Sequence, residues 1–146
     1  MAASRIADTI NWRRLPVTRD EHIAYWLAES DKDLVVMQSL FGSGHYTWAL
    51  FVGHLALEKA LKGLYVQRID LQVPRIHHLL KIARDCGLYL TDEQEDFLLE
   101  VTAYNLKGRY PDYKQSFARK ATRDFTATRI EQIKEMQQWL KAQVAG

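Results

Sequence analysis

The feature that most constrains this chain is a run of apolar residues spaced three and four positions apart between Tyr46 and Leu64. This spacing puts their side chains on one face of an α-helix for about five turns. A stripe this wide is typical of a helix packed at the centre of a domain. Small residues at Gly53, Ala56 and Ala60 would let a neighbouring helix approach closely. The sequence therefore predicts a central helix with other helices against it.

Recognisable start and stop signals bound the remaining helices. Thr18 and Thr91 each precede an acid or amide by three residues, which is the capping-box pattern of a helix start. Gly44 ends a Gly-Ser-Gly stop and Gly87 suits a left-handed helix end. Pro111 disfavours a helical conformation at the residue before it, so a break is expected over 108–112. Apolar spacing then predicts helices over 18–41, 46–64, 75–86, 91–105 and 116–144.

No window shows sustained alternation with β-branched residues, so no sheet is expected. The predicted fold is all-α: an up-and-down helical bundle of four long helices and one short helix. At 146 residues, with 47% hydrophobic and 26% charged residues, the chain has the size and composition of one globular domain. We expect residues 1–18 to be an N-terminal extension and residues 19–144 to form the bundle.

Composition also limits location and chemistry. The longest apolar runs are interrupted well before the roughly 18–20 residues that span a membrane, and the N-terminus lacks the apolar stretch of a secretory signal. Cys86 is the only cysteine, so no intramolecular disulfide can form. We expect a cytoplasmic protein that needs no cofactor or metal.

Charge is unevenly distributed. Residues 85–100 hold six acidic and no basic residues, whereas residues 105–129 hold seven basic residues against two acidic ones. Two interpretations are open. Such blocks can be solvated helix faces, or the basic block can be an edge that binds anions or RNA, because clustered Lys and Arg attract phosphate.

Two groups on or near the central helix carry possible chemistry. His54 and Glu58 stand four residues apart with His77 one loop away, a spacing that can bind a divalent metal. The zincin pattern is absent, so packing for His54 and a hydrogen bond near a helix start for His77 are favoured instead. Lys59 and Lys62 flank the same acid, which indicates either a buried structural ion pair or a ligand site.

Three stretches then resemble one family. Residues 51–62 resemble the A-x-E-K-A-L-K helix of HEPN domains (higher eukaryotes and prokaryotes nucleotide-binding). Residues 77–79 resemble the H-[DS]-L start of that family's next helix. Tyr104-Asn105 followed by residues 109–112 resembles its Y-N-x-x-x-R-Y-P-D stretch. Their order and separation fit, and the resemblance covers residues 20–143.

The resemblance implies a four- or five-helix bundle that is commonly a homodimer. HEPN proteins are often encoded beside a minimal nucleotidyltransferase, in toxin–antitoxin or related two-component systems. Many are metal-independent endoribonucleases that carry an Arg and a His with four to six residues between them, and the Arg and His of both protomers meet in a dimer cleft. Here Arg109 matches the arginine, but no histidine follows His78. The loop offers only Asp and Tyr side chains as acid or base, and these ordinarily titrate far from neutral pH.

The leading hypothesis is therefore a noncatalytic or weakly active HEPN dimer that binds nucleotide or RNA phosphate and partners a nucleotidyltransferase. Tyr104, Tyr110 and Tyr113 could stack a base, accept a nucleotidyl group, or simply hold the loop. The expected anion-binding residues are Lys59, Lys62, Asn105, Lys107, Arg109, Tyr110 and Lys114.

Two alternatives stay open. One is a metal-independent endoribonuclease with an atypical acid/base pair, whose candidate catalytic residues are Arg109, Asp112 and His77; His77 or His54 would have to reach the Arg109 loop. The other is a noncatalytic dimeric scaffold. Neither involves a membrane.

Overall fold

A computed structural model of the chain describes residues 17–107 and 111–145. All regular structure among these residues is helical, which confirms the all-α prediction. The six helices are α2 (Arg19–Gly42), α3 (Tyr46–Arg68), α4 (Leu79–Asp85), α5 (Asp92–Lys107), α6 (Pro111–Lys120) and α7 (Arg123–Ala145).

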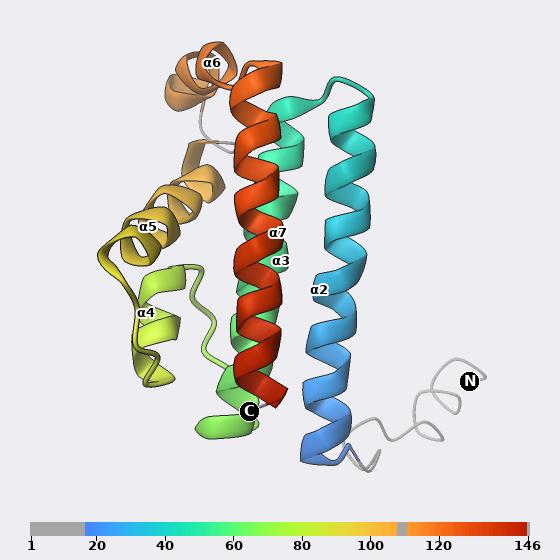
Figure 1. The fold of residues 1–146 in the computed structure, drawn as a ribbon, viewed down its shortest axis with the longest axis vertical. Helices are drawn as coiled ribbons and strands as arrows, with labels where there is room; N and C mark the ends of the chain where they lie inside the picture. The colour runs from blue at the N-terminus through green and yellow to red at the C-terminus, as the bar shows by residue number, and fades with distance from the viewer. Residues whose placement is uncertain (1–16, 108–110, 146) are drawn as a thin grey trace, which may run out of the picture.

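Three long helices form the body of the molecule. α2 runs up, α3 runs down beside it, and α7 runs down against both (Figure 1). α4 and α5 cover the other side of α3, and α6 lies at the end of the bundle where α3 begins (Figure 1). α3 packs against all five other described helices, so it is the central helix that the apolar stripe predicts.

Small residues make this central position possible. A Cβ atom placed on Gly53 would lie 2.6 Å from Ile133 Cδ1 of α7 and 3.0 Å from Met37 Sδ of α2. These distances are too short for any larger side chain without repacking. Gly53 therefore sets how closely α2, α3 and α7 approach, as its place in the stripe predicts.

The predicted helix signals function as expected. Thr18 Oγ1 accepts the Glu21 N–H at 3.1 Å. Thr91 and Gln94 bond reciprocally, each side chain accepting the other residue's N–H at 2.9 to 3.1 Å. Gly87 ends α4 in the left-handed conformation at φ 73°, with the paired backbone hydrogen bonds of a Schellman motif.

The C-terminal third differs from the prediction. The single helix expected over 116–144 is two helices, because α6 ends at Lys120 and α7 begins at Arg123. Thr122 causes the new start, since its Oγ1 accepts the Phe125 N–H at 3.2 Å. The short helix is also shorter than the predicted 75–86 and covers only Leu79–Asp85.

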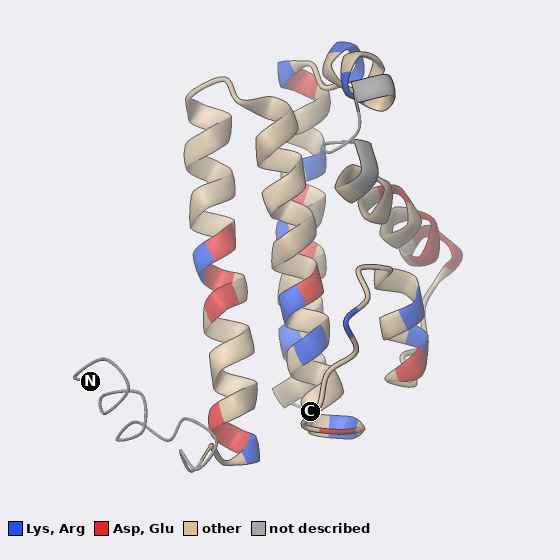
Figure 2. Cartoon of the chain, turned by 180° about the vertical axis from the view of Figure 1, so that it is seen from behind, with Lys and Arg blue, Asp and Glu red and all other residues tan. Residues whose placement is uncertain are grey.

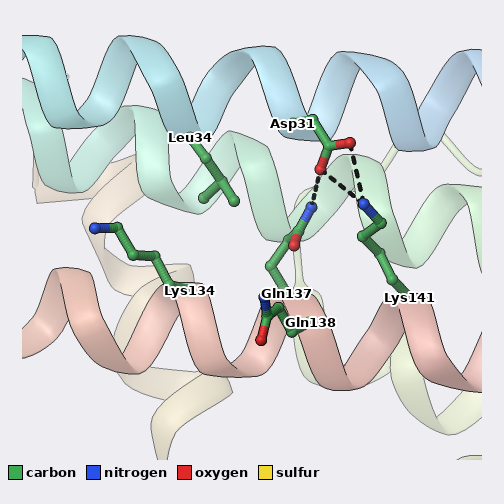
Figure 3. A pocket seen from close by; sticks show the side chains of 6 residues that line it. All are labelled: Asp31, Leu34, Lys134, Gln137, Gln138 and Lys141. Atoms are coloured by element: carbon green, nitrogen blue, oxygen red, sulfur yellow. Dashed lines mark hydrogen bonds and ion pairs between the residues drawn. The ribbon is translucent and has the colours of Figure 1, made fainter.

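A polar seam joins α2 to α7. Asp31 accepts hydrogen bonds from Gln137 Nε2 at 2.7 Å and from Lys141 Nζ at 3.1 Å, beside a shallow hollow (Figure 3). The buried Ser30 hydroxyl accepts from Gln137 at 3.2 Å and donates to the Ala56 carbonyl of α3 at 2.6 Å. Buried polar groups need such partners, so this network fixes the register of the three long helices. No described helix is long and apolar enough to cross a membrane.

Candidate functional site

The charged group on α3 is a buried cluster centred on Glu58. This carboxylate is only 5% exposed. Its Oε2 accepts from Lys62 Nζ at 2.9 Å, and its Oε1 lies 2.7 Å from His77 Nδ1, which belongs to the loop before α4. Lys62 is itself buried and lies over the ring of Trp26, 5.6 Å from its centroid. The cluster therefore ties α2, α3 and the loop before α4 together.

Electrostatics keep Glu58 ionised. Burial by itself raises the pKa of this carboxyl, but hydrogen bonds from Lys62 and His77, with the nearby charges of Lys62 and His54, outweigh it and hold the pKa below its usual range. His54 Nε2 lies 3.1 Å from the backbone carbonyl of His77 and 3.7 Å from Glu58 Oε1. His77 is thus fixed twice, at its ring and at its backbone.

The arrangement shows which contacts these residues make within the chain. Lys62 and Glu58 form the buried ion pair, and His54 and His77 take the packing and hydrogen-bonding positions favoured over metal binding. Among the described residues, no group of three or more His, Cys, Asp or Glu side chains could hold a metal ion.

Lys59 also contacts α2, through a different pair of carboxylates. Its Nζ lies 2.8 Å from Asp33 and 3.9 Å from Glu29, both on α2. Both predicted cations of the central helix therefore already have carboxylate partners within the chain.

A second charged contact clamps α5 to α7. Arg129 donates to both oxygens of Glu100, from Nε at 2.5 Å and from Nη2 at 3.1 Å. The Tyr104 hydroxyl donates to the same carboxylate, and the Tyr104 ring stacks on Phe117 of α6. Burial and the neighbouring Glu100 both raise the pKa of Tyr104, whose side chain is 1% exposed. Tyr104 is thus a core residue and is not exposed for a base to stack on it.

The cations of α6 and the start of α7 have different surroundings. Arg123 lies over the ring of Phe41, 5.8 Å from its centroid, and Lys120 lies over Phe125 at 5.6 Å. Arg123, Lys120, Arg119 and Lys114 form no ion pair with any residue whose side chain the structure describes. All four are exposed, and α6 and the start of α7, which carry them, lie at one end of the bundle (Figure 1). We call this group the basic corner: Lys114, Arg119, Lys120 and Arg123.

Only part of the predicted site falls within the described residues. Arg109 and Tyr110 lie outside them, and Lys107 and Asp112 lie in α5 and α6 with side chains that are not described. Asn105 is half-buried near the end of α5, and its Oδ1 makes no hydrogen bond to a described residue.

The remaining predicted residues divide between two places. Lys114 belongs to the basic corner, where the exposed Tyr113 precedes it. Lys59 lies thirteen residues along α3 from Tyr46, about 20 Å down the helix axis from the end where α6 lies. Within one chain, the structure therefore does not bring Lys59 and Lys62 together with Lys114.

Three members of the basic corner were missing from the predicted site. The chain holds no acidic residue three or four positions from Arg119 or Arg123, so neither can form a pair within a helix. Lys120 has Asp124 four residues later, but the helix break at 121–122 separates them. The absence of nearby acidic residues around Arg119 and Arg123 can be read from the sequence. The helix break that separates Lys120 from Asp124 cannot, because the apolar pattern continues across it.

The lone cysteine is not a candidate nucleophile. Cys86 is buried at the end of α4, where its carbonyl accepts from Arg68 Nη1 at 3.1 Å. Burial raises the pKa of its thiol to about 11, so the thiol stays protonated near neutral pH.

Comparison with known proteins identifies a family and a similar solved structure. The family model of the HEPN domain matches residues 23–143. The crystal structure of TT1696 from Thermus thermophilus is similar, with a TM-score of 0.71 and 25% sequence identity over 83% of this chain and 97% of that chain. No curated protein matches the chain.

Proposed function

Because this chain belongs to the HEPN domain family, we propose that it is a dimer that binds the phosphates of a nucleotide or of RNA and partners a minimal nucleotidyltransferase. The observation that carries the anion-binding part is the basic corner, whose four cations are exposed and have no carboxylate partner among the side chains that the structure describes. The nucleotidyltransferase partner, in a two-component and toxin–antitoxin-like system, is what the family resemblance implies.

Unpaired surface cations suit phosphate for a physical reason. A phosphate that approaches Arg119 or Arg123 does not have to displace an internal carboxylate, so the full charge of the guanidinium is available. Binding of nucleic acid by such residues is largely independent of sequence and falls steeply with salt. Arg109 and Lys107 come just before this corner in the chain and extend the same basic stretch.

The test is binding of a labelled single-stranded RNA and of labelled nucleotides at two salt concentrations. The triple variant Lys114→Ala/Arg119→Ala/Arg123→Ala should weaken RNA binding at least about tenfold at low salt and flatten the salt dependence by about 0.7 per lost phosphate contact. The matched control, Lys32→Ala/Lys134→Ala/Lys141→Ala, removes the same charge from residues that have carboxylate partners. It should bind RNA nearly as the wild type does.

Equal loss in both variants would mean that net charge alone attracts RNA. Absence of binding in the wild type would leave the dimeric scaffold as the better interpretation. Arg109→Ala, examined in the same assay, reports whether the preceding loop belongs to the same site.

One observation favours a second candidate function, metal-independent RNA cleavage. The half-exposed imidazole of His77 holds its Nδ1 against the buried Glu58 carboxylate, as a histidine used for proton transfer often does. Incubation of RNA without metal tests it: cleavage that is lost in His77→Asn but kept in the control variant His45→Asn would establish this activity. Intact RNA in the wild type would exclude it.

A further inference from the structure

The acidic block of the sequence takes no part in the proposed function. Residues 85–100 hold six acidic and no basic residues. All but the first of these acids lie on α5, whose first half carries acidic residues and no basic one (Figure 2). Arg84 pairs with Glu95 at 3.2 Å and Arg129 pairs with Glu100. The other acids of α5 have no countercharge among the side chains that the structure describes.

A hollow of about 330 Å³ lies between α5 and α7. Its apolar lining consists of Phe97 and Trp139, which are half-buried, and of Met136, which is buried. Glu93 lines the hollow from α5 and Glu135 lines it from α7, and both glutamates are exposed to solvent. We call this hollow the acidic groove. It combines an apolar lining with one carboxylate from each of its two helices.

The chain supplies no cation to either glutamate of the acidic groove. Glu93 and Glu135 form no ion pair within the part of the chain whose side chains are described. Neither has a Lys or Arg three or four residues away on its own helix. Lys134 precedes Glu135 in the chain, but its Nζ lies 2.7 Å from Gln38 of α2, a helix that does not line the groove.

We propose that the acidic groove binds an arginine side chain from a basic segment of a partner protein. The alkyl stem of an arginine can cover the apolar lining, and its guanidinium plane can stack on an aromatic ring, of which Trp is the best. Its fork of N–H donors can reach carboxylates on both helices, which the compact ammonium of a lysine does less well. The proposal does not rest on the proposed function, because no member of the basic corner lines the groove.

The charge of the groove selects this occupant over others. Phosphates of a nucleic acid would be repelled, and a neutral apolar partner would bury two carboxylates without a countercharge, which is costly. No group of three or more metal-binding side chains exists within the described ranges, so the two glutamates are not part of a metal cluster. Asp92 and Asp96 add unpaired negative charge on α5 outside the groove, and they would attract further basic residues of a protein segment.

The experiment is an NMR titration of the protein, at about 0.15 M salt, with a short capped alanine peptide that carries two arginines. The peptide should shift the amide signals of the acidic groove, and the same peptide with the uncharged citrulline in place of arginine should not. Glu93→Gln/Glu135→Gln should weaken binding at least about fivefold. Trp139→Leu keeps the lining apolar but removes the aromatic face, so it should weaken binding about threefold.

The matched control is Asp92→Asn/Asp96→Asn, which removes the same charge from the same helix outside the groove and should change binding no more than about twofold. Far-UV circular dichroism checks that each variant folds. Equal loss in the control overturns the proposal, because net charge alone would then attract the peptide, and so does equal binding of the citrulline peptide.

A second copy of the chain is the remaining alternative, since its basic corner also carries arginines. Self-association that both Glu93→Gln/Glu135→Gln and Arg119→Ala/Arg123→Ala abolish would make that corner the occupant and would overturn the proposal. The glutamate variant should bind RNA at least as well as the wild type, because it keeps every cation of the basic corner. Loss of peptide binding and loss of anion binding are therefore distinguishable.

Discussion

Two groups of cations in this molecule have the same chemistry and opposite surroundings. Lys59 and Lys62 lie on the central helix with carboxylates 2.8 and 2.9 Å away. The basic corner, at the end of the bundle, has no such partners among the described residues. The basic block of residues 105–129 and the central helix α3 both suggest an anion site from sequence, but the two are not equivalent. A cation is available to a ligand only where no carboxylate of the chain already pairs with it.

The difference also separates stability from binding. Lys62 is buried, so removal of Glu58 would leave its ammonium group without a countercharge and with little water to replace it. The cations of the basic corner are hydrated, so their removal costs the fold little. Mutations of the buried pair should thus lower the free energy of unfolding, whereas mutations of the basic corner should lower the affinity for RNA.

The largest expected effect is on stability, from Glu58→Gln. This change leaves the buried Lys62 ammonium without its countercharge, and breaking a buried pair in this way costs about 3 kcal/mol. Urea unfolding followed by circular dichroism measures it, with the slope of the transition checked for constancy.

The matched control is Asp85→Asn, which breaks the exposed pair with Lys81 and should cost at most about 0.5 kcal/mol. A loss from Glu58→Gln no larger than that of the control would show that water reaches the cluster. The double variant Glu58→Leu/Lys62→Met should recover much of the loss, because it removes both charges together.

A smaller effect distinguishes two arginines of the same basic block. Arg129 makes two hydrogen bonds to Glu100 and lies over Phe125, whereas Arg123 makes no ion pair with a described residue. Arg129→Ala should lower the free energy of unfolding by about 1.5 kcal/mol and leave RNA affinity nearly unchanged. Arg123→Ala should instead weaken RNA binding and change the free energy of unfolding by no more than about 0.5 kcal/mol. Equal effects of the two variants on RNA binding would contradict the distinction.

Local signals explain why so much of the fold could be predicted. Helix starts at Thr18 and Thr91 depend on residues three positions apart, and the stripe of α3 depends on residues three and four apart. The break before α7 was missed although it uses the same kind of signal, because Thr122 lies inside an apolar pattern that runs on through both helices.

The site was less predictable because its contacts are distant in sequence. The i,i+4 pair of Glu58 with Lys62 follows from helix spacing. The partners His77 and Asp33 lie 19 residues from Glu58 and 26 residues from Lys59, and only the packing of α3 against its neighbours brings them within reach. The same packing gives Lys59 its carboxylate partner on α2.

The smallest expected effect is the pH dependence that Glu58 imparts. Its pKa in the folded state is below the ordinary value, so the unfolded chain takes up a proton first as the pH falls. The stability it contributes is fully present above the unfolded pKa, near 4.3, and is lost as the pH drops through the folded pKa. Between pH 7 and pH 4 only the beginning of this loss should be visible.

Urea midpoints measured across that range test the sign. The wild type should lose stability on acidification more steeply than the Glu58→Leu/Lys62→Met variant, which lacks the titrating pair. Glu100 titrates in the same direction, since hydrogen bonds from Arg129 and Tyr104 outweigh its burial and hold its pKa below the usual range, so both proteins should still show a residual slope. Identical slopes would mean that Glu58 binds its proton equally well in the folded and unfolded chains, and the contacts with Lys62 and His77 would then do no more than offset the cost of burying the carboxylate.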